Sequence, residues 1–192
     1  MSSNEEILKW RFDISTFRLI GRELITDRIT ALFELVKNSY DANAKRVNVI
    51  FKNITPISIM DRNGNIIAAP NPDCRIIIQD NGYGMSFEDI RDKWMVIGTA
   101  SKRKKPYSPE PYNRRCVGEK GIGRFAVDKL GDKVNIITKK EGENQWLNVE
   151  VDWRKYIKEE DSDEIKLFTD VENKFKYEIG EINASGTTLN IS

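Results

Sequence analysis

Three short stretches of the chain hold the residues whose types could do chemistry. The first, ELVKNSYDA, contains Glu34, Asn38 and Asp41; the second, DNGYGM, runs from Asp80 to Met85; the third, GEKGIGRFA, runs from Gly118 to Ala126. They supply carboxylates beside an amide, an aspartate before a glycine turn, and a glycine loop that opens a helix. Each stretch alone is common, but together they are the parts needed to hold a magnesium nucleotide.

The first stretch has helical spacing. At about 100° per residue, Glu34, Asn38 and Asp41 fall within roughly 60° of one another on a helix. Apolar residues repeat at the helical period from Ile25 to Val36, and we expect this stripe to face the opposite side. An amide oxygen suits Mg²⁺, and a carboxylate one turn away can orient or deprotonate a water. Because the chain has no histidine, Glu34 is the natural candidate for the base.

The second stretch places Asp80 directly after the apolar run from Arg75 to Gln79, which predicts a buried strand. Gly82 and Gly84 then let the backbone turn and approach a ligand closely. A carboxylate held there can accept a hydrogen bond from an exocyclic amine such as the adenine N6. A buried acceptor left unpaired costs about 1–3 kcal/mol, so such a site would reject a base that lacks the amine.

The third stretch contains Gly118, Gly121 and Gly123 before a predicted helix, whose first backbone amides attract phosphate oxygens. It is not a P-loop, because the required Lys-Ser/Thr pair does not follow the last glycine. It matches the dinucleotide fingerprint loosely, but no strand is predicted directly before it. Lys102, upstream, could contact a phosphate as a point charge, and a solvated lysine is the equal alternative.

A basic segment leads into this glycine loop. From Lys102 to Arg124 there are eight Lys or Arg residues against two Glu. Pro106, Pro109 and Pro111 interrupt the segment, which therefore predicts a long mobile loop instead of a helix or a strand. Two interpretations stay open, a solvated loop and a flap that faces an anion.

The rest of the pattern predicts an α/β fold, a two-layer sandwich of a mixed sheet with helices on one face. The predicted helices are one capped by Ser15 and running through Leu24, one capped by Thr26 or Asp27, one capped by Ser86, and Gly123 to Leu130. The predicted strands are Arg46 to Lys52, a hairpin from Pro56 to Ala69 with Asn63-Gly64 at its turn, Arg75 to Gln79, Lys133 to Lys139, Gln145 to Asp152 and Thr187 to Ile191. Residues Tyr156 to Phe175 are ambiguous.

The chain has 192 residues, enough for a single domain, and it stops directly after a predicted strand, so we expect a fragment of a longer protein. No run approaches the roughly 20 apolar residues that a membrane span needs. The acidic N-terminus, MSSNEEILKW, does not fit a signal peptide. We therefore expect a cytoplasmic protein in which Cys74 and Cys116 are reduced.

Taken in order, these stretches resemble the motifs of the GHKL superfamily, which includes DNA gyrase B, the heat-shock chaperone, histidine kinases and MutL. ELVKNSYDANA resembles its N-box, DNGYGM and GEKGIGRFA its two glycine boxes, and Gly186-Thr187-Thr188 its late Gly-Thr element. The resemblance covers roughly Thr26 to Ile191. It implies a Bergerat fold, in which ATP lies between the sheet and the helices under a mobile lid.

The resemblance also implies a role for each matching residue. Glu34 would activate the attacking water, Asn38 would bind Mg²⁺, and Asp80 would hold the adenine amine. The remaining residues expected to contact the nucleotide are Asp41, Gly82, Gly84, Met85, Lys102, Gly118, Gly121, Ile122, Gly123 and Thr187. Among these, Gly121 and Gly123 would wrap the phosphates, Thr187 would lie near the adenine through water, and Lys102 is a looser match.

Within the superfamily, Glu34 before Asn38 resembles the hydrolysing branch, which includes MutL and microrchidia proteins. The resemblance therefore implies a Mg-dependent ATPase, slow as an isolated domain, that closes its lid and forms a homodimer when ATP binds. Two alternatives stay open: a nucleotide-gated module that binds nucleic acid through the basic segment from Lys102 to Arg124, and a kinase module acting on a histidine of a partner. Contacts of the lid are not carried over, because Lys102 to Arg115 departs from the family pattern. The sequence does not name the biological client.

Overall fold

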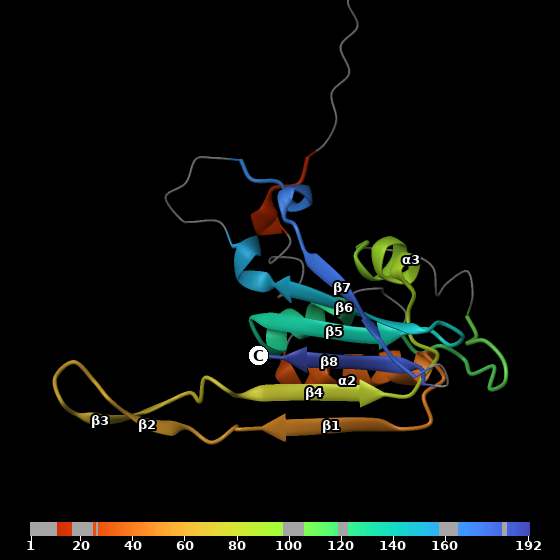
Figure 1. Cartoon of the computed structure of the whole chain (residues 1–192). Coiled ribbons are helices and arrows are strands. Elements are labelled where there is room, and N and C mark those ends of the chain that lie inside the picture. Colours follow the sequence, from red (N-terminus) through yellow and green to blue (C-terminus); the bar gives the residue numbers. More distant parts are fainter. Residues whose placement is uncertain are drawn as a thin grey trace, which may run out of the picture.

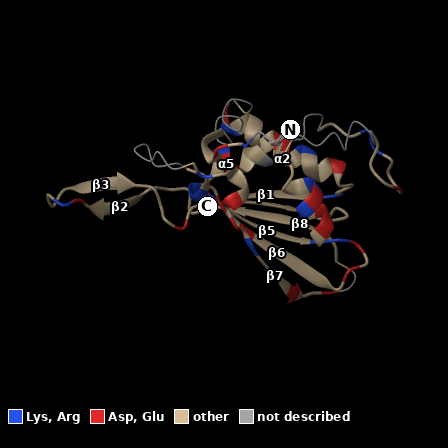
Figure 2. Cartoon of the chain, turned by 90° about the horizontal axis from the view of Figure 1, so that it is seen from above, with Lys and Arg blue, Asp and Glu red and all other residues tan. Residues whose placement is uncertain are grey.

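A six-stranded sheet with helices on one face is the main feature of the computed structural model, which describes residues 11–16, 25, 27–97, 106–118, 123–157, 165–181 and 184–192 (Figures 1 and 2). The strand order is β1-β4-β8-β5-β6-β7. Its strands are β1 (Val47–Lys52), β4 (Arg75–Asp80), β5 (Lys133–Lys139), β6 (Gln145–Asp152), β7 (Lys174–Ile179) and β8 (Gly186–Ile191). A separate two-stranded sheet consists of β2 (Ile57–Met60) and β3 (Ile66–Ala69).

Among the described helices, only α2 (Arg28–Asp41) is longer than five residues. It is followed by α3 (Phe87–Asp89), which continues into a π turn (Ile90–Trp94), and by α5 (Ala126–Leu130), which follows a 3-10 turn (Gly123–Phe125). Two further 3-10 turns are Trp153–Tyr156 and Phe168–Asp170. In the part of the chain that the structure describes, every helix is too short or too polar to cross a membrane.

The predicted α/β two-layer architecture is confirmed, but the expected mixed sheet is wrong. Every strand pairing among the described residues is antiparallel. Strands β4 and β5 run in the same direction, yet they are not neighbours, because β8 lies between them and is antiparallel to both (Figure 1). The alternation of apolar and polar residues locates the strands in the sequence. It does not show that β8, the last strand, lies between β4 and β5 and so decides which strands pair.

Helix α2 starts at the predicted cap. The Asp27 carboxylate accepts hydrogen bonds from the backbone N–H groups of Ile29 and Thr30, both at 2.8 Å, so of the two predicted caps the structure uses Asp27. Ser86 likewise caps α3 through a capping box with Asp89. Ser15 does not cap a helix: residues 14–16 are helical, and Ser15 donates its N–H and hydroxyl to Asp13. The rest of that predicted helix lies outside the described residues.

Helix α2 does not bury the whole of the expected apolar stripe. Ile29 and Phe33 are 70% and 63% exposed, whereas Leu32 is partly buried and packs against the core. The fully buried row is Ala31, Leu35 and Ser39, which follow one another at intervals of four residues. Both rows have helical period, so periodicity alone cannot choose between them. The small side chains of Ala31 and Ser39 let the helix lie close to its neighbours.

The core lies between the sheet and the helices. It combines Leu35 of α2 with alternate residues of the strands, for example Val134 and Ile136 of β5 and Val149 and Val151 of β6. The predicted strands agree with the observed ones to within two residues, and the predicted hairpin forms β2 and β3. Strand β7 was not predicted: the stretch left ambiguous ends at Phe175, inside this strand, although the strand alternates polar and apolar residues (KFKYEI).

Candidate functional site

Asp80 ends β4 with a partly buried carboxylate whose two oxygens are both held by the protein. Oδ1 accepts hydrogen bonds from the N–H groups of Gly82 at 2.9 Å and Thr187 at 3.3 Å. Oδ2 accepts a hydrogen bond from the Ser39 hydroxyl on α2 at 2.8 Å. Burial raises the pKa of the Asp80 carboxyl, and the hydrogen bonds from Gly82, Ser39 and Thr187 oppose that rise. The carboxylate therefore has a fixed orientation at the junction of sheet and helix.

The glycines after Asp80 are required by the protein's own backbone. A Cβ atom on Gly82 would lie 2.4 Å from the carbonyl oxygen of Ala42 at the end of α2. One on Gly84 would lie 1.9 Å from the carbonyl oxygen of Lys139 at the end of β5, and Gly84 also has a φ of +68°. The turn thus packs against α2 on one side and β5 on the other, which places Asp80 between them.

Asn38 of α2 lies beside the 3-10 turn that precedes α5. It is exposed, and its amide nitrogen lies 3.1 Å from the position that a Cβ of Gly123 would occupy. The structure therefore brings the amide of the first stretch next to the last glycine of the third stretch. Glu34, one turn earlier, is half-buried, and its Oε1 accepts a hydrogen bond from Lys37 Nζ at 2.6 Å. Lys37 is a partner that the sequence did not indicate.

Asp41 is buried, and its carboxylate has structural partners within the protein. Its two carboxylate oxygens accept hydrogen bonds from the backbone N–H groups of Val117 at 2.8 Å and Gly118 at 3.1 Å. These two residues lead into the glycine loop. Asp41 therefore attaches the beginning of that loop to the end of α2, while a direct contact of Asp41 with a nucleotide stays a prediction.

The segment before Val117 is folded, not an open loop. Residues 106–116 form a small hairpin, in which the N–H of Ser108 donates to Arg114 O and the N–H of Cys116 donates to Pro106 O, both at 2.8 Å. The prediction of a mobile loop is wrong for this part, because prolines exclude regular strands but do not exclude such a hairpin. We call residues 106–118 the anchored lid segment, because the resemblance implies a lid in this part of the chain; that role stays a prediction.

Arg114 attaches the anchored lid segment to α2. Its guanidinium lies over the rings of Tyr40 and Tyr112, at 4.9 and 4.6 Å from their centroids. Its Nη1 also donates to the carbonyl oxygen of Ala44 at 2.9 Å. The charge of Arg114 is thus engaged by contacts within the protein. Arg115 is the other cationic residue of the anchored lid segment, and it is exposed.

Strand β8, the neighbour of β4 in the sheet, also borders the site. Thr187 pairs with Asp80 across the two strands, and its hydroxyl lies 2.9 Å from that of Thr138 on β5. Thr138 is fully buried and accepts a hydrogen bond from the N–H of Met85 at 2.9 Å. Sequence reasoning missed Thr138 and Ser39. A threonine inside a strand carries no signal of its own, and Ser39 stood next to Asn38 but on another face of the helix.

The predicted site residues fall into two groups. Near the turn after β4 or at the end of α2 lie Glu34, Asn38, Asp41, Asp80, Gly82, Gly84, Met85, Gly118, Gly123 and Thr187. Lys102, Gly121 and Ile122 lie outside the described residues. Within the described ranges, no group of three or more acidic, cysteine or histidine residues forms a metal site. A Mg²⁺ ion needs no such group, because it keeps several waters and binds substrate phosphates.

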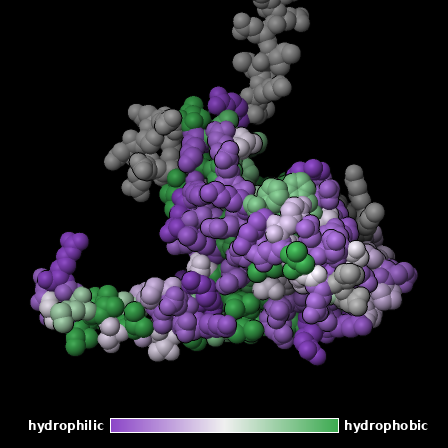
Figure 3. Space-filling view, in the orientation of Figure 1, coloured by the Kyte–Doolittle hydropathy of each residue, from purple (hydrophilic) through white to green (hydrophobic). Residues whose placement is uncertain are grey.

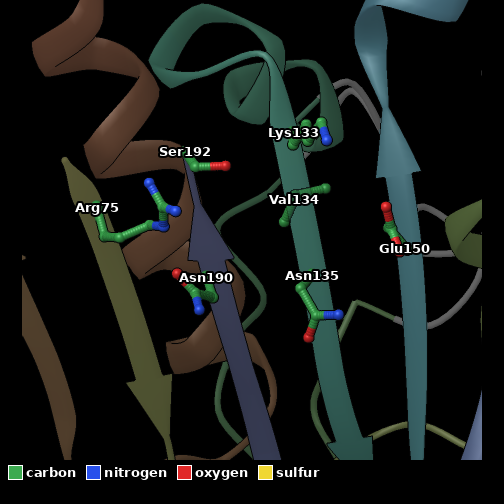
Figure 4. A pocket seen from close by; sticks show the side chains of 7 residues that line it. All are labelled: Arg75, Lys133, Val134, Asn135, Glu150, Asn190 and Ser192. Carbon is green, nitrogen blue, oxygen red and sulfur yellow. The ribbon is translucent and has the colours of Figure 1, made fainter. Parts of the chain in front are cut away.

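A shallow hollow of about 170 Å³ lies on the open face of the sheet, at its other end (Figure 4). Its lining residues are Arg75, Lys133, Val134, Asn135, Glu150, Asn190 and Ser192. Arg75 starts β4 and Asp80 ends it, so the hollow and the carboxylate are roughly 17 Å apart along the strand. The hollow is therefore separate from the candidate site.

Comparison with known proteins agrees with this geometry. Residues 26–187 match the family described as histidine kinase-, DNA gyrase B-, and HSP90-like ATPase. Chaperone protein HtpG of Rickettsia typhi (strain ATCC VR-144 / Wilmington) is 27% identical over 151 residues, which cover 75% of this chain and 24% of that protein. HtpG of Roseobacter denitrificans (strain ATCC 33942 / OCh 114) is 25% identical over 177 residues, 90% of this chain and 25% of that protein.

A relative with a different name shows similar identity. The putative type II restriction enzyme HgiDII of Herpetosiphon aurantiacus is 28% identical over 131 residues, 68% of this chain and 18% of that protein. The chain thus spans about a quarter or less of the length of these relatives. Proteins with different names share this region, so the likeness alone does not assign a biological task.

Replacing Gly84 should destabilise the fold much more than replacing Gly64. Both glycines have positive φ, but a Cβ on Gly64 meets nothing within 4 Å. We expect Gly64→Ala to lower the free energy of unfolding by about 1–2 kcal/mol, the cost of left-handed backbone. Gly84→Ala should cost more than about 3 kcal/mol, because a backbone carbonyl must also move. Urea unfolding measures both, and equal losses would contradict the packing described for the turn.

The ionised Asp80 should lower stability at neutral pH. Its folded-state pKa is raised, so the folded protein holds the proton more tightly than the unfolded chain. The stability from this group is fully present below the unfolded pKa and is lost as the pH rises through the folded pKa. Asn can keep the hydrogen bonds to Gly82, Thr187 and Ser39. We therefore expect Asp80→Asn to be at least as stable as the wild type at pH 7, with a difference that shrinks toward pH 4 in urea titrations. The prediction is contradicted if the stability of the variant, expressed relative to that of the wild type, is lower at pH 7 than at pH 4.

Proposed function

Because this chain belongs to the histidine kinase-, DNA gyrase B- and HSP90-like ATPase family, we propose that it binds ATP with Mg²⁺ and hydrolyses it. One arrangement carries the proposal. The carboxylate of Asp80 is attached to α2 through Ser39, and the neighbouring residue Asn38 faces Gly123 at the start of α5. Ser39 and Asn38 are consecutive residues of α2. This helix therefore connects Asp80, the acid proposed to recognise the base, with the segment at Gly123 proposed to face the phosphates.

Asp80 is the proposed recognition residue for adenine. A carboxylate offers about four lone-pair positions, and the protein fills three of them from Ser39, Gly82 and Thr187. One acceptor position remains for the exocyclic amine of the base. Since the three protein donors already fix its orientation, the carboxylate need not reorganise when the base arrives.

Asn38 is the proposed protein ligand of Mg²⁺. Its amide oxygen is a hard ligand, and the exposed position leaves room for the waters and phosphate oxygens that complete the coordination of this ion. Bound Mg²⁺ would neutralise charge on the phosphates. The amides near Gly123 would bind phosphate oxygens, and Asp41 would position this loop by holding the N–H groups of Val117 and Gly118.

Glu34 is the proposed general base. It lies one turn before Asn38 on α2, so its carboxylate can accept the proton of a water that attacks the terminal phosphorus while the ADP oxygen leaves. Lys37 occupies Oε1, and Oε2 is the oxygen we assign to the water. The Glu34–Lys37 pair is 26% and 41% exposed, so it is a weak ion pair that restrains the base without sequestering it.

We further propose that ATP closes the remainder of the lid and brings two copies together. The anchored lid segment is attached to α2 by Arg114 and Asp41, so we expect it to stay with α2 when the lid closes. Nucleic-acid binding by the basic segment has little support among the described side chains, because Arg114 is used within the protein and Arg115 is the other cation that the structure describes there. A phosphoacceptor histidine would have to come from a partner, since this chain has none. The cytoplasmic location stays a prediction.

Asp80→Asn should weaken ATP binding without unfolding the protein. The amide would present N–H groups toward the adenine amine, so the acceptor is lost. We expect the dissociation constant of ATP, measured by calorimetry, to rise about 10- to 100-fold, which corresponds to the 1–3 kcal/mol of an unpaired buried group. Glu150→Gln, a carboxylate exposed on the open face of the sheet, is the matched control and should bind like the wild type. Equal affinity in Asp80→Asn and wild type would remove the adenine assignment.

Glu34→Gln should separate binding from turnover. The side chain keeps its size but cannot take a proton, so we expect phosphate release to slow by about 10²- to 10⁴-fold. The dissociation constant of ATP should change less than about twofold, because the water, not the nucleotide, contacts this group. Phosphate release and calorimetry on the same preparation measure the two quantities, again beside Glu150→Gln. Unchanged turnover would assign the base elsewhere.

A further inference from the structure

A hairpin arm projects from the end of the main sheet (Figures 1 and 2). The arm consists of β2, β3 and the turn Asp61–Asn65, and its strands pair Ile57 with Ala69 and Ile59 with Ile67. The turn is ordered, because Asp61 accepts hydrogen bonds from the N–H groups of Asn63 and Asn65. Asn53 Nδ2 donates to Asp73 O at 3.2 Å and closes the base of the arm. The arm is therefore a defined element.

The arm has apolar residues on both faces and no core of its own. Ile59 and Ile67, on one face, are 40% and 43% exposed; Met60 and Ile66, on the other, are 72% and 77% exposed. None of these residues belongs to the hydrophobic core of the described chain. Figure 3 shows the apolar surface of the arm standing apart from the body. A two-stranded hairpin packed on nothing is marginal in water, so this surface fits an interface.

The edges of the arm also differ from the other strand edges. Strand β7, at one edge of the main sheet, carries Lys174, Lys176 and Glu178, and β1, at the other, carries Lys52. Charged residues of this kind prevent pairing with another chain. The eight residues of β2 and β3 include no charged residue. The arm thus lacks the protection that both edges of the main sheet have.

We propose that the arm binds the arm of a second copy of this chain, by antiparallel pairing of the two β3 strands. Such an interface is isologous: the same surface serves both copies, and the two hairpins form one four-stranded sheet. This association needs no nucleotide, and it is separate from the ATP-driven association proposed above.

Charge selects the β3 edge over the β2 edge. Pairing centred on Ile67 places Ile66 opposite Ala68 of the second copy and stops before Pro70, which lacks an N–H. Each exposed tip residue Arg62 then approaches the base of the other arm on the side of Asp73, which is also exposed. The base on the β2 side, residues 53–56, carries no acidic residue, so pairing through β2 would offer Arg62 no opposite charge.

The first test is the mass of the nucleotide-free protein by sedimentation equilibrium. We expect a reversible dimer whose dissociation constant rises about tenfold or more in Ile67→Lys, equivalent to about 1.4 kcal/mol. Ser58→Lys places the same charge on the β2 edge and should leave the dimer unchanged. The arm lies at the end of β4 away from Asp80, so both variants should bind ATP like the wild type. Unchanged ATP binding would also show that both variants fold. If the wild type is monomeric without nucleotide, the proposal is wrong. It is also wrong if Ser58→Lys abolishes the dimer and Ile67→Lys does not. Either result leaves the ATPase assignment intact.

Charge exchange is the second test, and it is specific to two copies. Arg62→Asp and Asp73→Arg should each weaken the dimer by a few-fold, the range for exposed ion pairs. The double variant restores opposite charges at both contacts and should recover the wild-type dissociation constant. Additive losses in the double variant would rule out this register.

Discussion

The hydrogen bond from Ser39 to Asp80 joins the two layers of this protein at the point where its chemistry is proposed. It connects the last residue of β4 to the buried row of α2, and with Gly82 and Thr187 it leaves the carboxylate one free acceptor position. The glycines after Asp80 are needed because the turn has no space between Ala42 and Lys139. Backbone packing and recognition are therefore two consequences of the same close approach of helix and sheet.

The same helix end also positions the lid. Asp41 holds the N–H groups of Val117 and Gly118, and Arg114 stacks on Tyr40. Helix α2 therefore contributes four functions within about two turns. Ser39 holds Asp80, and Asp41 holds the anchored lid segment. Asn38 is the proposed metal ligand and Glu34 the proposed base. Ala31 and Ser39 are small members of the buried row, and larger side chains at these two positions would move the helix away from the sheet. The arm shares none of these contacts, so its proposed interface can vary independently of the nucleotide site.

Relatives with different names contain this region as a quarter or less of their length. A region shared by proteins of different names is expected when the surfaces that distinguish their tasks lie outside the common fold. In this chain the proposed interface lies on the arm. Neither the arm nor the anchored lid segment contributes a residue to the hydrophobic core of the described chain.

The sequence by itself determined five of the six strands of the main sheet, a helix cap at Thr26 or Asp27, and the hairpin turn, because these depend on residues close together in the chain. Only the tertiary structure decided that α2 turns Ala31 and Leu35 inward and that β8 separates β4 from β5. It alone also brought Ser39 and Thr138 to the site and showed that the N–H of Thr187 donates to Asp80. The physical reason is separation: the hydrogen bond between Thr187 and Asp80 joins residues 107 positions apart, and local periodicity contains no information about such a partner.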